Sequence, residues 1–229
     1  MKTASSIKLS PSALNLFVDC PRCFWLEKNK NIKRPRGIFP SLPGGMDRVI
    51  KTYFDGFRKQ KKLPPELSGP EFIGFSLFED QKQLDLWREW KTGPCFKDED
   101  GSVLSGALDD LLVKDGAYVP FDYKTKGSPA TLEDSIRYYQ NQLDCYALLM
   151  EANKLGTAGF GYLLYFSPRD VAGNGQIRFE VQPLKIPVNT ERAKGVLRQA
   201  VKALQEPLPS SKPACEYCAW LRNFKTPFK

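Results

Sequence analysis

Two apolar segments near the middle of the chain contain charged residues in their interiors. Residues 103–113 and 117–125 are rich in strand-forming residues, and Asp115-Gly116 between them is a turn signal of β-hairpins. The pattern predicts two antiparallel strands at the centre of the fold. Their charged residues include Asp109, Asp110, Asp122 and Lys124. A carboxylate among apolar strand residues is costly unless it is ion-paired or binds a metal.

Strand geometry groups these charges. Side chains alternate between the faces of a strand, so Asp122 and Lys124 project together and the neighbouring aromatic residues project the other way. The hairpin can bring a carboxylate of the first strand beside them, although alternation alone does not choose between Asp109 and Asp110. Two such carboxylates form an oxygen site for Mg²⁺ or Mn²⁺, and the lysine can stabilise a phosphoryl group. The simpler alternative is a surface ion pair beside a solvated turn.

Histidine is absent from the 229 residues, which excludes several enzyme classes. Ser-His-Asp hydrolases, Cys-His thiol enzymes and nucleases with a histidine base all need that side chain. The net charge of +8 favours a polyanionic partner, and a hydrophobic content of 41% allows a packed core. No apolar run is long enough to span a bilayer and no signal peptide opens the chain, so we expect a cytoplasmic protein without a membrane partner.

The remaining secondary structure follows from apolar periodicity, capping residues and turn signals. The predicted helices span residues 11 to about 20, 47–60, 79–91, 131–153 and 190–205. Two further strands are predicted near 159–166 and 176–183, and residues 31–45 are predicted to form a loop because they are rich in proline and glycine. This order predicts an α/β chain with its strands in the middle and helices at both ends.

Three segments resemble, in order and spacing, the motifs of the PD-(D/E)xK nuclease superfamily, in particular RecB/AddB-type and CRISPR-associated RecB-like exonucleases. These segments are Gly106-x-x-Asp109, Asp122-x-Lys124-Thr125 and Gln142-x-x-x-Tyr146. The resemblance implies a restriction-endonuclease-like α/β core, with a central mixed sheet flanked by helices. It also implies a single nuclease domain over residues 1–229, with its catalytic core at about 100–185.

The resemblance implies roles for these residues in hydrolysis of DNA phosphodiester bonds. Asp109, Asp122 and the Tyr123 carbonyl would bind Mg²⁺ or Mn²⁺, and Lys124 would stabilise charge. Gln142 and Tyr146, which share one helical face, would position the substrate. We expect exonuclease-like action on single-stranded DNA, in repair, recombination or CRISPR-type processing within a larger complex. The alternative is a non-catalytic DNA-binding or scaffold module that retains the fold.

One position departs from the family pattern. The family has a histidine or glutamate on the helix before the sheet, a few residues after a glycine, and Asp47 is the only candidate here. Asp47 is either a further metal ligand or a helix N-terminal charge that complements the helix dipole.

Two CxxC pairs lie at opposite ends of the chain, at Cys20 and Cys23 and at Cys215 and Cys218. Four thiolates brought together form a site for zinc or an iron–sulfur cluster, and unligated buried cysteines are the alternative. The resemblance implies a 4Fe-4S cluster, with Zn²⁺ as the other candidate. It also implies a helical cap, stapled by these cysteines, from residues 9–30 and 207–224.

Overall fold

A mixed five-stranded sheet forms the centre of the protein, in a computed structural model that describes residues 7–35, 37 and 41–224. Its strand order is β2-β5-β6-β7-β8, in which β6 and β7 are parallel and all other neighbours are antiparallel. The strands are β2 Phe75–Leu77, β5 Asp110–Lys114, β6 Ala117–Thr125, β7 Phe160–Val171 and β8 Ile177–Pro187. A smaller sheet has the order β1-β4-β3, from β1 Lys8–Leu9, β3 Cys95–Lys97 and β4 Val103–Ser105.

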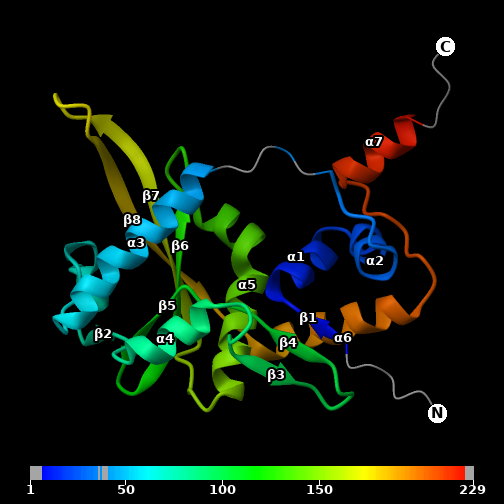
Figure 1. The fold of residues 1–229 in the computed structure, drawn as a ribbon, viewed down its shortest axis with the longest axis horizontal. Coiled ribbons are helices and arrows are strands. Elements are labelled where there is room, and N and C mark those ends of the chain that lie inside the picture. Colours follow the sequence, from blue (N-terminus) through cyan, green and yellow to red (C-terminus); the bar gives the residue numbers. More distant parts are fainter. Residues whose placement is uncertain (1–6, 36, 38–40, 225–229) are drawn as a thin grey trace.

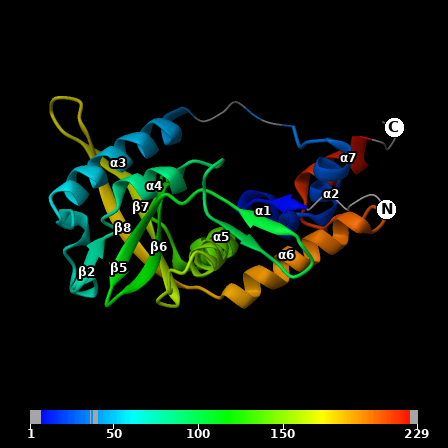
Figure 2. The same ribbon diagram turned by 60° about the horizontal axis from the view of Figure 1, so that its bottom comes forward.

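Helices flank the central sheet on both faces (Figures 1 and 2). They are α1 Pro11–Asp19, α2 Pro21–Lys30, α3 Ser41–Lys59, α4 Gln81–Arg88, α5 Leu132–Ala152, α6 Thr190–Gln205 and α7 Glu216–Phe224. Two short 3₁₀ helices, Pro65–Leu67 and Pro70–Phe72, precede β2. The predicted α/β architecture, with a mixed sheet flanked by helices as in restriction-endonuclease-like folds, is confirmed. None of the described helices is both long and apolar enough to cross a lipid bilayer.

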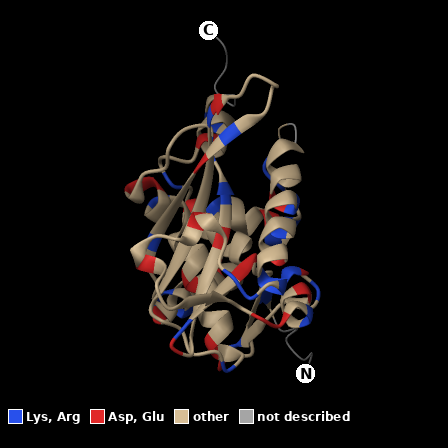
Figure 3. Ribbon diagram, turned by 90° about the vertical axis from the view of Figure 1, so that its left-hand side faces the viewer, with Lys and Arg blue, Asp and Glu red and all other residues tan. Residues whose placement is uncertain are grey.

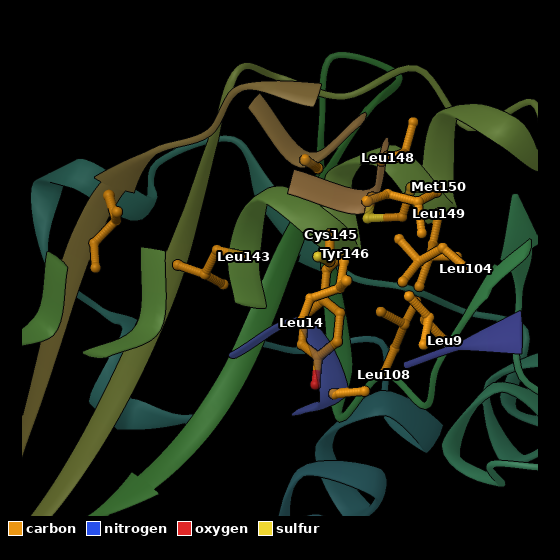
Figure 4. Packing of buried hydrophobic residues seen from close by; sticks show 14 of the residues in the cluster. Leu9, Leu14, Leu104, Leu108, Leu143, Cys145, Tyr146, Leu148, Leu149 and Met150 are labelled. Carbon is orange, nitrogen blue, oxygen red and sulfur yellow. The ribbon is translucent and has the colours of Figure 1, made fainter. Parts of the chain in front are cut away.

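The two faces of the sheet bury separate hydrophobic clusters because side chains alternate along each strand. On one face, α3 packs Ile50 and Phe54 against Phe121 of β6. On the other face, α5 packs against β6, β7 and β8 and against α1 and α6. Figure 4 shows the α5 residues Tyr146, Leu149 and Met150 beside leucines from β1, α1 and β4. The long helix α5 is therefore fixed relative to both sheets.

The two ends of the described chain meet away from the central sheet. In Figures 1 and 2, α2 and α7 lie side by side at the end of the molecule opposite the β7–β8 hairpin. Side-chain hydrogen bonds also tie α2 to the end of α6. Trp25 donates to the Glu206 carbonyl at 2.9 Å and Asn29 donates to the Leu204 carbonyl at 2.9 Å. Helices from both ends of the sequence thus form one helical unit beside the core.

The prediction of one strand over residues 103–113 is wrong, because the chain changes sheet within this segment. β4 belongs to the small sheet and β5 to the central one, and residues 106–109 connect them. Gly106 lies so close to the start of α1 that a Cβ there would be 2.8 Å from Cδ of Pro11. The Leu108 N–H donates to the carbonyl of Trp87 instead of to a strand. Contacts with α1 and α4 therefore divide a segment whose apolar pattern is continuous in the sequence into two separate strands.

Helix boundaries were predicted unequally well. α1, α5 and α6 begin within a residue of their predicted starts, and the side chains of Ser10, Thr131 and Asn189 cap them by accepting backbone hydrogen bonds. The predicted loop over residues 31–45 is too long, since α3 begins at Ser41. Pro43 lies in the first turn of α3, where its missing N–H has no intrahelical partner to lose. The helix α2 and the extensions of β7 and β8 were not predicted.

Candidate active site

The β5–β6 hairpin determines which carboxylate stands beside Asp122. Asp115 and Gly116 form a two-residue turn with φ of 50° and 78°, and the resulting register pairs Asp110 with Phe121. Directly paired residues project to the same face, so Asp110 shares the face of Phe121. The preceding residue, Asp109, projects to the face of Asp122.

Asp122 lies at the centre of a hydrogen-bonded cluster between β6 and α5. Its Oδ2 contacts Nζ of Lys124, and its Oδ1 accepts from Nε2 of Gln142 at 3.0 Å. Lys124 Nζ also donates to Oε1 of Gln142 at 3.3 Å and lies 4.6 Å from the centre of the Tyr139 ring. Gln142 Nε2 and the Tyr146 hydroxyl are 2.6 Å apart. The helical residues of the third motif therefore contact the strand residues of the second.

Side chains from α3 and α4 contact Asp109. Nζ of Lys51 lies 2.8 Å from Asp109 Oδ1 and 3.0 Å from Asp47 Oδ2. Nε of Arg88 donates to the main-chain carbonyl of Asp109 at 2.8 Å. Asp47 consequently reaches the cluster through Lys51. Sequence reasoning missed Lys51, although its position four residues after Asp47 on the same helix is a signal that the two side chains meet.

The two carboxyl groups differ in their affinity for protons. Burial raises the pKa of Asp122 to about 7, and the nearby Asp109 acts in the same direction while Lys124 opposes both. Burial also acts to raise the pKa of Asp109, but Lys51 and Lys124 outweigh it and leave that pKa below its usual value. Asp109 therefore ionises more readily than Asp122, as expected of two close carboxylates of which Asp122 is the more deeply buried.

The donor atoms of this cluster fit a hard divalent cation. Oδ2 of Asp122 is buried and is ion-paired with the Lys124 ammonium. The pairing of β5 with β6 stops at Phe121, so β6 beyond that residue has only β7 as a strand partner in the described structure. Carboxylate and carbonyl oxygens at one point are the ligands that Mg²⁺ and Mn²⁺ prefer. Asp109 and Asp122 are placed to hold the ion, and the carbonyl of Tyr123, which follows Asp122 on β6, is the third candidate ligand.

Asp110 belongs to a different network on the opposite face of β5 and β6. Its Oδ2 accepts from Arg58 at 2.6 Å, from Arg88 at 3.3 Å and from the Tyr123 hydroxyl at 2.6 Å. Arg88 also forms a bidentate pair with Asp55. Burial raises the pKa of Asp110 despite the two arginines. These contacts tie β5 and β6 to α3 and α4 and place Asp110 away from the Asp109–Asp122 cluster.

Two cavities adjoin the cluster. One of about 280 Å³ is lined by Asp47 and Lys124, together with Pro43, Ile50, Tyr123, Thr125 and Tyr139. The other, of about 530 Å³, begins at Gln142 and Tyr146 and extends between α1 and β4. Its outer lining includes Lys8, Lys28 and Trp90 but no acidic residue. A ligand could therefore approach the carboxylates from two sides.

The two CxxC pairs meet in a second, separate cluster. The sulfur atoms of Cys20, Cys23, Cys215 and Cys218 lie within 4.8 Å of one another, and all four residues are buried. Cys23 Sγ is 3.6 Å from the sulfur atoms of both Cys215 and Cys218. The first pair comes from the α1–α2 junction and the second from the start of α7. The predicted meeting of the four cysteines is confirmed.

The surroundings of these cysteines favour a thiolate at Cys20, whereas burial raises the pKa of Cys23 and Cys218. Burial acts to raise the pKa of Cys20, but hydrogen bonds from the backbone N–H groups of Cys23 and Lys212 help to lower it to about 7. Nη2 of Arg34 lies 3.5 Å from Sγ of Cys215, and Arg34 also pairs with Asp19. Thiolate is the form that binds a metal. The cluster is therefore suited to a soft metal ion or an iron–sulfur centre.

Comparison with known protein families gives a match. A family model described as the PD-(D/E)XK nuclease superfamily matches residues 38–222, which include both carboxylates, Lys124, Gln142 and the second cysteine pair. No curated protein matches the chain.

Proposed function

Because the chain belongs to the PD-(D/E)XK nuclease superfamily, we propose that it is an Mg²⁺- or Mn²⁺-dependent deoxyribonuclease that works through Asp109, Asp122 and Lys124. The single observation that carries this proposal is the convergence of the two carboxylates, the lysine and Gln142 at one end of β6. An ion held there supplies Lewis-acid stabilisation of the phosphoryl oxygens.

Each residue has a part in hydrolysis that follows from its contacts. Asp109, Asp122 and the Tyr123 carbonyl are the proposed metal ligands. Lys124 stands next to both Asp122 and Gln142, where its ammonium group can hold the attacking water or a phosphate oxygen. Water adds to phosphorus as the P–O bond to the leaving group breaks, and one proton passes to that oxygen. Gln142 and Tyr146 orient the substrate. Asp47 contributes through Lys51 or as a further ligand.

The larger cavity supports a single-stranded substrate. Lys8 and Lys28 can contact phosphates, and Trp90, which is 69% exposed, offers a surface on which an unpaired base can stack. In the view of Figure 3, basic and acidic residues are interspersed rather than gathered into a uniformly positive face. DNA binding therefore depends on local contacts such as those of Lys8, Lys28 and Trp90. We place the strand along this cavity, with an end or a nearby phosphodiester at Asp122, as exonuclease-like action requires. Trp90→Ala should then weaken binding of single-stranded DNA more than binding of duplex DNA.

The cysteine cluster has a structural part in this proposal. At a Zn–S distance of about 2.3 Å, tetrahedral geometry separates sulfur atoms by roughly 3.8 Å. The spacings of 3.6 and 3.9 Å between Cys23 and Cys215 and between Cys20 and Cys218 support Zn²⁺. The resemblance to RecB/AddB-type nucleases supports a 4Fe-4S cluster, in which each thiolate binds a different iron atom and the sulfur atoms stand further apart. Either would join residues 9–30 and 207–224 into a cap on a single domain.

The rival function is a non-catalytic module that binds DNA within a larger repair or CRISPR complex. Digestion of end-labelled single- and double-stranded DNA in Mg²⁺, Mn²⁺ and EDTA separates the two. The nuclease cleaves in either metal and stops in EDTA, and Asp122→Asn does not cleave in any condition. A scaffold binds DNA equally in EDTA and leaves every substrate intact. The latter result, from a folded and DNA-binding protein, would exclude the proposed activity.

A further inference from the structure

Lys51 is a second lysine in the cluster, and the three family motifs do not include it. Its Nζ lies 2.8 Å from Asp109 Oδ1 and 3.0 Å from Asp47 Oδ2. Lys51 follows Asp47 by one turn of α3, so both side chains leave the helix on the same side. The Lys51 side chain is 22% exposed. A positive charge is therefore fixed between two carboxylates that a divalent cation could otherwise share.

The charge balance of the cluster argues against two divalent ions. Asp47, Asp109 and Asp122 contribute three negative charges when ionised, and Lys51 and Lys124 contribute two positive charges. The net charge of −1 becomes +1 with one divalent ion, which attracts a phosphodiester. A second ion would raise it to +3 and would stand close to an ammonium group. Repulsion between a divalent ion and an ammonium group at such short distances is stronger in a partly buried site than in bulk water.

The contacts of the carboxylate oxygens also argue against two divalent ions. Lys51 holds Oδ1 of Asp109 and Gln142 holds Oδ1 of Asp122. Oδ2 of Asp122 is in turn ion-paired with Lys124. With so many of the carboxylate oxygens engaged by cationic or amide side chains, the site suits one shared ion rather than two. In two-metal nucleases, additional carboxylate oxygens hold the second ion, about 4 Å from the first.

We propose that Lys51 takes the place of a second divalent cation, so that this nuclease works with a single Mg²⁺ or Mn²⁺. The inference rests on the proposed function, because it concerns the same metal site. Lys51 is a positioning residue that orients Asp109, and Asp47 holds Lys51 in place.

Titration with Mn²⁺, followed by electron paramagnetic resonance of the free ion, tests this proposal. Mn²⁺ prefers oxygen ligands, so it reports on the carboxylates rather than on the thiolates. The wild type should bind one Mn²⁺ and Lys51→Met, which removes the charge at similar size, should bind two. Lys51→Arg keeps the charge and should bind one. Lys61→Met is the matched control, since Lys61 pairs with Glu79 on the surface, and it should also bind one.

The outcomes separate this inference from the proposed function. Two Mn²⁺ ions at the carboxylates of the wild type would overturn the inference while leaving the nuclease proposal intact. A single ion in both the wild type and a folded Lys51→Met variant would also overturn it. If Lys51→Met does not fold, the rate of wild-type cleavage decides, since a first-order dependence on Mg²⁺ supports one ion and a cooperative dependence contradicts it. No Mn²⁺ binding and no cleavage by the wild type would instead reject the proposed function.

Discussion

Asp109 and Asp110 are sequence neighbours in contrasting environments. Asp109 faces the candidate metal site, where its carboxylate is paired with Lys51. Asp110 is fully enclosed on the other face, between Arg58, Arg88 and the Tyr123 hydroxyl. A buried charge without its partner is strongly destabilising, whereas a metal ligand can be lost without unfolding the protein. Substitutions at the two positions should therefore separate stability from chemistry.

We predict that Asp110→Asn lowers the free energy of unfolding by about 3–5 kcal/mol, because it removes the nearer carboxylate partner of the buried Arg58 guanidinium and leaves it only Asp55 at 3.5 Å. Asp109→Asn, at the metal site, should change that free energy much less while abolishing cleavage. Urea denaturation followed by circular dichroism measures both variants. If Asp110→Asn is as stable as the wild type, or if Asp109→Asn cleaves normally, the assignment of the two residues is wrong.

The raised pKa of Asp122 predicts that metal binding depends on pH. The folded protein holds this proton up to about pH 7, and a metal ion binds the ionised carboxylate. In the metal-free protein, the Asp122 carboxyl stabilises the fold most at low pH, where it is protonated. This stabilisation is lost as the pH rises from the pKa of Asp122 in the unfolded state through its pKa in the folded state. Mn²⁺ affinity should rise by up to about tenfold per pH unit below pH 7 and level off above it. A flat profile in this range would contradict the coupling.

At the scale of elements, the hairpin is the part that the sequence specifies best. The Asp115-Gly116 turn and the alternation in residues 117–125 predict β6 and its faces correctly. Pairing residues outward from the same two-residue turn also sets Asp109 opposite Asp122. The hairpin register therefore distinguishes Asp109 from Asp110, which strand alternation alone did not. Lys51 could be anticipated from its spacing to Asp47. Its contact with Asp109 could not, because it depends on how α3 packs on the sheet.

Other elements depend on contacts that are distant in sequence. Residues 103–113 have a continuous apolar pattern, yet packing of Gly106 on α1 divides them between two sheets. α2 has weak amphipathicity in sequence and begins at Pro21, directly after α1, so its residues gave no separate helical signal. Both features are decided by tertiary packing rather than by local propensity.

We predict that Gly106→Ala destabilises the protein by about 1–3 kcal/mol, because the new Cβ would overlap the Pro11 ring in a packed position. Gly45→Ala is a matched control within α3, since a Cβ there meets nothing within 4 Å, and it should be neutral or stabilising. Thermal unfolding of the two variants measures the difference. Equal melting temperatures would show that the approach of α1 to residue 106 is not tight.

At the scale of the whole molecule, the cysteine cluster joins segments about two hundred residues apart. It connects the α1–α2 junction to the start of α7, beside the helices that pack on the core. A cross-link that closes a long loop reduces the entropy of the unfolded chain, and metal binding adds to the free energy of folding. The carboxylates lie in a separate cluster, so the cysteines should affect activity through stability.

We predict that Cys20→Ala or Cys218→Ala lowers the melting temperature substantially, whereas Cys95→Ala, at an exposed cysteine outside the cluster, does not. Metal analysis of anaerobically purified protein should find about one zinc ion, or a brown protein with about four iron atoms, per chain. Loss of either cysteine should release that metal. Absence of zinc and iron, with four freely titrating thiols in the folded protein, would refute a shared site.

The rate of DNA cleavage by Lys124→Met, compared with the wild type at saturating Mg²⁺, tests the central claim most directly. Lys124 contacts both Asp122 and Gln142 and is not needed as a metal ligand, so the variant should fold and bind DNA. Removing one well-placed electrostatic group should slow cleavage by about 100- to 1,000-fold. Lys61→Met should cleave at the wild-type rate. Wild-type cleavage by a folded Lys124→Met protein would contradict the assignment of this cluster as the active site.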